Sequence, residues 1–208
     1  MGIVHHTATL SPTKQELVDA WLPGRSWAEG QHVAGKVAEY RFDDPEGEVG
    51  VETILWRTTD GTVVQTPLTY RAAPLDGAEA HLVGTTDHSV LGQRWVYDGC
   101  GDPVWAATLV DTIATGGRQA QMFIEEDGRR VDVPPRMQVR GSGTDDPAPR
   151  LGRIDAVADE GAVTVVTAGD VEIAVARVVG APLGDGPHLS GTVGDSDETT
   201  VLAVLRRR

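Results

Sequence analysis

The stretch YRFDDPEGEVGVETILW, residues 40–56, decides the fold because it contains two alternating strand patterns joined by a turn. Up to Phe42, apolar and charged residues alternate, which places Ala38, Tyr40 and Phe42 on one face of a strand. Residues 44–47, Asp-Pro-Glu-Gly, have the composition of a tight turn. The alternation then resumes at Val49, Val51, Thr53 and Leu55. The sequence therefore predicts an antiparallel hairpin.

A second turn follows at Asp60-Gly61, where both residues tolerate the positive φ angles that tight hairpin turns need. The next strand is predicted over Thr62–Arg71 and contains Pro67, which has no backbone N–H to donate. Proline is found in sheets mainly on edge strands or at bulges. We therefore expect this strand to lie at an edge of the sheet or to contain a bulge.

Two helices are predicted on either side of these strands. Ser11-Pro12 has the composition of a helix start, and the helix is expected to end at Pro23-Gly24. Its apolar face would carry Leu17, Val18, Trp21 and Leu22. Asp102-Pro103 repeats the start signal, and Gly116-Gly117 ends the second helix. Trp105, Leu109 and Ile113 follow one another at intervals of four residues, which is typical of a core-facing stripe.

The chain after residue 117 is predicted to be almost entirely β-structure. Hairpin turns are expected at Asp127-Gly128, at Gly169-Asp170 and across residues 194–197. Residues 140–149 are rich in Gly, Asp and Pro, which is typical of a linker or loop. The predicted fold is therefore α+β: an antiparallel sheet with packed helices over residues 1–118, followed by a β-rich antiparallel domain over residues 119–208.

The charge of the chain limits its partners. With 31 acidic against 18 basic side chains, the net charge is −13, which opposes binding to nucleic acid or to an anionic membrane. The single cysteine, Cys100, cannot form an internal disulfide. No secretory leader and no stretch of roughly 20 apolar residues is present. We therefore expect a soluble cytoplasmic protein.

Two groups of polar residues are candidates for a catalytic or a metal site. His81, Asp87 and His88 could supply a general base, with Ser89, Thr85 or Cys100 as the nucleophile, but no G-x-S-x-G or H-E-x-x-H motif accompanies them. A cluster of acids around the first turn could bind a hard cation, but its spacing does not match a calcium loop: Asp43, Asp44, Glu46 and Glu48. Loop histidines and a solvated acidic turn are the favoured interpretations.

Aromatic residues offer a different kind of site. Trp27, Trp56 and Trp95 could stack on sugars, although core packing is the default for each. The stretch Arg94-Trp95-Val96-Tyr97 is the best candidate for carbohydrate binding. The phosphate-binding motif G-x-x-x-x-G-K-[ST] is absent, and so is the catalytic loop of a protein-kinase-like site. Phosphoryl transfer by this chain alone is therefore not expected.

The strings YRFDDPEGEVGVE (40–52), TPLTYRAAPLDGAEAHLVGT (66–85) and DHSVLGQRWVYDGCGDPV (87–104) resemble the N-terminal cap domain of actinobacterial maltokinases and related aminosugar kinases. The resemblance extends over residues 10–115. It is closer to short stand-alone cap-like proteins whose β-rich tail resembles residues 188–208. It implies a sheet packed on helices that, in the kinases, precedes a two-lobed ATP-dependent phosphotransferase. No catalytic residue is carried over, because the kinase motifs are missing.

The leading hypothesis is a non-catalytic accessory or regulatory protein that acts through protein contacts in maltose, trehalose or α-glucan metabolism, with a sugar kinase or an α-glucan or trehalose enzyme as its partner. The alternatives are a small carbohydrate- or metabolite-binding module, and a kinase-related protein that retains nucleotide binding. No catalytic residue, metal ligand or cofactor is assigned, and the oligomeric state is left open. The candidate ligand or partner surface comprises His81, Asp87, His88, Arg94, Trp95 and Tyr97.

Overall fold

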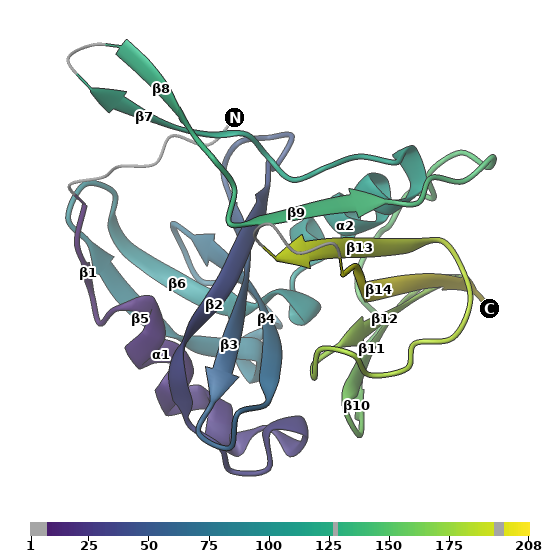
Figure 1. Ribbon diagram of the computed structural model, residues 1–208, viewed down its shortest axis with the longest axis horizontal. Helices are drawn as coiled ribbons and strands as arrows, with labels where there is room; N and C mark the ends of the chain where they lie inside the picture. Colours follow the sequence, from purple (N-terminus) through teal and green to yellow (C-terminus); the bar gives the residue numbers. More distant parts are fainter. Residues whose placement is uncertain (1–7, 127–128, 194–197) are drawn as a thin grey trace.

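The computed structural model describes residues 8–126, 129–193 and 198–208, and within them the chain forms two six-stranded antiparallel sheets and a two-stranded ribbon (Figure 1). The strands are β1 (Leu10–Ser11), β2 (Val33–Phe42), β3 (Gly50–Thr58), β4 (Val63–Arg71), β5 (Leu82–His88), β6 (Gly92–Asp98), β7 (Met122–Glu126), β8 (Arg129–Val133), β9 (Met137–Gly141), β10 (Ala156–Glu160), β11 (Val163–Ala168), β12 (Val171–Ala176), β13 (His188–Val193) and β14 (Thr200–Arg207). The helices are α1 (Lys14–Trp21) and α2 (Pro103–Thr115), with short 3-10 turns η1 (Leu22–Gly24), η2 (Ser26–Ala28), η3 (Glu79–His81) and η4 (Gly99–Gly101). The predicted α+β class is confirmed.

The first sheet has the strand order β1-β5-β6-β4-β3-β2. The predicted hairpin around residues 44–47 joins β2 to β3, with Tyr40 opposite Thr53. Strand β3 is buried on both faces, because Ile54 and Trp56 face the apolar side of α1 while Val51 and Leu55 face the core around α2. A charged residue within this strand, Glu52, is therefore buried as well.

Helix α1 begins two residues later than the sequence suggested. Thr13, not Ser11, is the N-cap: its hydroxyl accepts from the backbone N–H of Glu16, and the Glu16 carboxylate accepts from the backbone N–H of Thr13 at 2.7 Å. This reciprocal pair is a capping box, which satisfies two N–H groups at the helix start. Ser11 belongs to β1 instead and pairs with Asp87 on β5.

Pro67 does not lie on an edge strand, contrary to the expectation. It is in β4, which has β3 on one side and β6 on the other, and it pairs with Thr53. On the other side of β4, pairing to β6 begins only at Leu68, while the backbone N–H of Gln65 donates to the carbonyl oxygen of Arg177 at 2.8 Å. Pro67 therefore stands where β4 changes partners, a place where a missing N–H breaks no ladder bond.

Helix α2 follows the predicted pattern and packs between the two sheets. Asp102 caps its N-terminus, Gly116 ends it in the left-handed conformation, and its predicted stripe is buried: Trp105, Leu109 and Ile113. The first half of segment 140–149, predicted to be a linker or loop, is held against α2. Gly141 belongs to β9 and lies against the helix, and the N–H groups of Gly143 and Thr144 donate to carbonyls of its last turn at 2.9 and 3.0 Å.

The second sheet has the order β10-β11-β12-β14-β13-β9 and is joined to the first by buried polar contacts. The Gln65 amide on β4 donates to the carbonyls of Ala176 and Leu202, both at 3.1 Å. One hydrophobic cluster contains residues of both sheets and α2, including Phe42, Leu109 and Leu189. The strands that form the second sheet and the ribbon begin after α2, and the division at residue 118 stays a prediction.

Several predicted turns can be compared with the strands. The turn at Gly169-Asp170 joins β11 to β12, as expected. The turns at Asp127-Gly128 and residues 194–197 lie outside the described residues, although the strands flanking them, β7 with β8 and β13 with β14, do pair. In the described part of the chain, neither helix has the length and apolar character needed to cross a bilayer.

Candidate functional site

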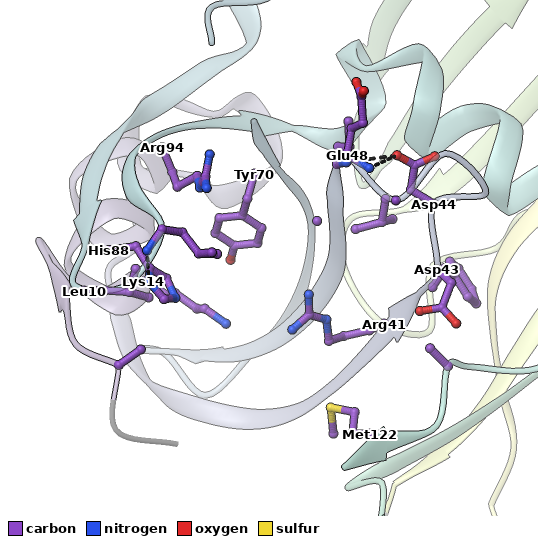
Figure 2. A pocket seen from close by; sticks show the side chains of 18 of the residues that line it. Leu10, Lys14, Arg41, Asp43, Asp44, Glu48, Tyr70, His88, Arg94 and Met122 are labelled. Atoms are coloured by element: carbon purple, nitrogen blue, oxygen red, sulfur yellow. Dashed lines mark hydrogen bonds between the residues drawn. The ribbon is translucent and has the colours of Figure 1, made fainter. Parts of the chain in front are cut away.

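A cavity of about 530 Å³ lies between the β2–β3 hairpin and the segment that leads from β1 into α1 (Figure 2). The start of β6 contributes a further wall, and residues 120–122 close another side. Apolar side chains line part of it: Leu10, Phe42, Val49, Val51, Leu91 and Met122. This volume is within the range of pockets that hold small metabolites.

Three basic side chains line the cavity, although the protein carries a net charge of −13. They come from different elements: Lys14 from α1, Arg41 from β2 and Arg94 from β6. Figure 2 shows Lys14 and Arg41 extending toward the same space from opposite sides, with Arg94 on the other side of Tyr70 from Arg41. The cavity therefore has a basic wall, formed by Lys14, Arg41 and Arg94, and an acidic rim, formed by Asp43, Asp44 and Glu48.

The buried carboxylate of Glu52 organises this basic group. Lys14 donates to both of its oxygens, at 2.8 and 2.7 Å, and the Tyr70 hydroxyl donates to Oε2 at 2.7 Å. Burial by itself raises the pKa of Glu52, but the charges of Lys14 and Arg41 and these hydrogen bonds outweigh burial and lower the pKa to about 2. Glu52 is thus ionised and fully engaged.

Arg41 and Arg94 are in a different position from Lys14. Arg41 sits directly opposite Glu52 in the β2–β3 ladder and influences it through its charge. Both arginines are partly buried residues, and neither hydrogen bonds through its side chain to any residue in the described part of the chain. Their donors therefore remain available at the cavity wall.

The acidic turn of the hairpin forms the opposite rim. Asp44 shapes this loop, since its carboxylate accepts from the backbone N–H groups of Glu46, Glu48 and Val49 at 3.1, 3.0 and 2.9 Å. Figure 2 shows the bonds from Asp44 toward Glu48. Among the described residues no group of three acidic, His or Cys side chains is arranged to hold a metal ion. The role of Asp44 is to fix the turn.

Two of the six residues in the predicted surface, His88 and Arg94, line the cavity. Asp87 is exposed beside His88 at the end of β5. His81 precedes the other end of this strand, roughly 20 Å away at the usual rise per residue. The structure therefore separates His81 from the Asp87-His88 pair that the general-base hypothesis placed with it.

The remaining candidates take part in packing. The His81 ring lies against Gly101, where an added Cβ would be 2.1 Å from it. Tyr97 is buried, and its hydroxyl accepts from the backbone N–H of Leu75 at 2.9 Å. Trp95 is partly buried on β6, opposite Thr85. Of the other tryptophans proposed for stacking, Trp27 and Trp56 are buried, which confirms the default of core packing.

The candidate nucleophiles are also held by the fold. Cys100 is fully buried in η4, and burial raises the pKa of its thiol well above the ordinary value. The hydroxyl oxygen of Ser89 accepts from the backbone N–H of Thr9 at 3.0 Å. These contacts support the structure around the β1–β5 pairing and the start of α2.

Sequence reasoning missed two residues of the basic wall, Lys14 and Arg41. It also missed Glu52 and Tyr70, which lie against them. A signal for part of this group was present, because Glu52 interrupts a strand that is otherwise apolar or Thr up to Trp56. Moving one residue along the predicted hairpin register from the Tyr40–Thr53 pair would have placed Arg41 opposite Glu52. Lys14 comes from a helix 38 residues away, and no local pattern indicates that contact.

Comparison with family models gives a match to part of the chain. Residues 21–102 match the family model of the maltokinase N-terminal cap domain. The matched segment runs from the end of α1 to the N-cap of α2, and it includes Arg41, Glu52, Tyr70 and Arg94. No curated protein matches the chain significantly. This segment is thus similar to the maltokinase N-terminal cap domain, and Lys14 and the second sheet lie outside the match.

Proposed function

From the cap-like domain at residues 21–102, we propose that this chain is a non-catalytic accessory or regulatory module that acts through protein contacts in maltose, trehalose or α-glucan metabolism. The partner is a sugar kinase or an α-glucan or trehalose enzyme. The family match supports the metabolic setting, since the matching family is named for the cap of maltokinase. How the buried acids are used supports the non-catalytic role.

The observation that carries this proposal is the use of the three buried carboxylates in the described residues. Each of them binds a cation of the same chain: Glu52 binds Lys14, Asp98 binds Arg177 and Asp102 binds Arg71. Asp102 also caps α2 and accepts from Thr69 at 2.7 Å. Acids held in this way stabilise a fixed structure, whereas a general base needs a carboxylate free to take a proton.

A contact surface is available on the cap-like half. Val90 and Leu91, in the turn between β5 and β6, are 55% and 48% exposed. Leu91 also lines the cavity, so the apolar turn and the basic wall are adjacent. Exposed aliphatic side chains next to a hollow are typical of surfaces that bind another protein. We assign the partner contact to this turn.

The test is affinity capture from the native host with three baits: wild type, Leu91→Asp and Val201→Asp. Val201 is also exposed, at 37%, but lies on β14 in the second sheet. Enrichment of a sugar kinase or an α-glucan or trehalose enzyme by wild type and Val201→Asp, but not by Leu91→Asp, supports the proposal. Equal recovery by all three baits, or no such enzyme with wild type, contradicts it.

A second candidate is a metabolite-binding module, favoured by the cavity and its basic wall. Calorimetric titration with maltose, trehalose and glycogen fragments distinguishes it from the first. A saturable heat that Arg94→Gln removes would favour binding of a small carbohydrate at this cavity. If none of the three carbohydrates gives a binding heat, the hypothesis of carbohydrate binding is contradicted.

A further inference from the structure

We propose that the cavity binds the oxyanion of a small ligand, a phosphate or a carboxylate, through the guanidinium groups of Arg41 and Arg94. The inference goes beyond the accessory role and does not depend on any protein partner. It starts from the charges around the cavity. Lys14, Arg41 and Arg94 line it, Asp43, Asp44 and Glu48 line its acidic rim, and the buried Glu52 is bonded to Lys14.

The Glu52 carboxylate already has a counter-charge and hydrogen-bond donors within the chain. Lys14 donates to both of its oxygens and Tyr70 adds a third hydrogen bond. This pairing neutralises one positive charge and leaves those of Arg41 and Arg94 without a bonded counter-charge in the described part of the chain. Partly buried arginines lose some hydration, so an anion that enters the cavity supplies hydrogen bonds as well as a counter-charge.

Guanidinium chemistry selects the ligand class. An arginine presents planar, paired N–H donors that match the oxygens of phosphate or carboxylate in a two-point contact. Here the two forks come from different strands, Arg41 from β2 and Arg94 from β6. An oxyanion that enters the cavity is attracted by both guanidinium charges and by the charge of Lys14.

The site is also preformed. Arg41 and Tyr70 lie on paired regions of one sheet, and a Cβ added at Gly50 would be 3.3 Å from the Tyr70 side chain and 3.7 Å from Nη2 of Arg41. The absence of a side chain at residue 50 therefore leaves room for this arrangement. A site on strands loses little conformational freedom when a ligand binds.

The rest of the cavity fits a small organic body. Its volume of about 530 Å³ exceeds what a bare phosphate needs, and apolar side chains line the space between the arginines and the acidic rim. That rim carries the negative charges of Asp43, Asp44 and Glu48. These charges repel a second anionic group, so the ligand carries its oxyanion at one end.

The experiment titrates the purified full chain with inorganic phosphate and, separately, with the monocarboxylate butyrate, at constant ionic strength balanced with sodium chloride. Amide NMR shifts report on the site, and the melting temperature reports on binding to the folded state. The variants are Arg41→Gln, Arg94→Gln and Arg41→Lys, with Arg153→Gln as the control because Arg153 is 88% exposed in the other half of the chain.

We expect saturable binding of phosphate or butyrate to wild type and Arg153→Gln, with shifts at residues of the cavity wall. Arg41→Gln and Arg94→Gln should each weaken binding by roughly tenfold or more, since each removes a charged hydrogen-bonding group. Arg41→Lys should weaken it less, because the charge remains while the fork is lost.

The inference is overturned if wild type responds to neither anion beyond the response to sodium chloride. It is equally overturned if both glutamine variants bind as tightly as wild type. Arg41 and Arg94 lie on different strands, so a folding defect in one variant leaves the other as the test.

Discussion

Nη2 of Arg177 lies 2.5 Å from Oδ2 of Asp98, although the two residues are 79 positions apart in the chain. Asp98 ends β6 in the first sheet, and Arg177 follows β12 in the second. Its Nε donates to Thr164 at 2.7 Å, and the Trp27 ring lies 5.0 Å from the guanidinium carbon. Asp98 keeps Arg177 protonated, since its charge outweighs burial and raises the pKa of the guanidinium. This buried pair ties the sheets together.

Breaking this pair should strongly destabilise the protein. Asp98→Ala leaves a buried guanidinium without a counter-charge, and we expect a loss of about 3–5 kcal/mol in the free energy of unfolding, measured in urea. Arg153→Ala, which removes the exposed pair with Asp155 at 3.6 Å, should change it by less than about 1 kcal/mol. Equal effects of the two substitutions would show that the Arg177–Asp98 contact does not join the sheets.

The lowered pKa of Glu52 should make the free energy of unfolding depend on pH. Its pKa falls from 4.5 to about 2 on folding, so its contribution is complete above pH 4.5 and is lost as the pH falls toward 2. The contribution is on the order of 3 kcal/mol. Glu52→Gln should be less stable than wild type at neutral pH, and the difference should shrink across this window.

The measurement for Glu52 is the free energy of unfolding across the acid range up to neutral pH, with Glu46→Gln as the control. Glu46 is an exposed carboxylate in the β2–β3 turn, so its removal should leave the acid limb of the stability curve in place. A difference between wild type and Glu52→Gln that stays constant with pH would refute the assigned charge state.

Gly141 tests the contact between the second sheet and α2. A Cβ at this position would lie 2.0 Å from the carbonyl oxygen of Thr112, a backbone atom that cannot rotate away. Gly141→Ala should therefore cost roughly 1–3 kcal/mol or more. Gly152→Ala is the matched control, since a Cβ added there would have nothing within 4 Å, and its stability should match or exceed wild type.

Trp105 tests the packing of α2 itself. The side chain is 2% exposed and packs against Gly99, where an added Cβ would lie 2.8 Å from the indole ring. Trp105→Ala should lower the free energy of unfolding by about 3–5 kcal/mol. An unchanged denaturation midpoint would mean that this face of α2 is not part of the core.

Local chemistry explains why much of the fold could be predicted. Asp44, Gly61 and Gly169 mark turns whose flanking residues alternate, so the hairpins follow from the sequence alone. Asp102 and Gly116 define α2 in the same way. These features depend on neighbouring residues and on backbone preferences, which a single sequence contains.

Long-range pairing explains what could not be predicted. Pro67 is tolerated in a central strand because β4 has two partners on the side opposite β3. Segment 177–179 bonds to β4 before Pro67, and β6 pairs with it from Leu68 onward. The basic wall needs Lys14, Arg41 and Arg94 to converge from three elements, and nothing local to each residue indicates this. The sequence therefore indicated only the edge of the candidate site, through His88 and Arg94.

The accessory role is tested most directly by measuring the affinity of the purified chain for the sugar kinase or α-glucan enzyme recovered from its host. We predict a saturable complex by calorimetry with wild type and Val201→Asp, and binding at least about tenfold weaker with Leu91→Asp. The absence of any complex, together with phosphorylation of maltose by this chain alone that a single substitution abolishes, would contradict the account.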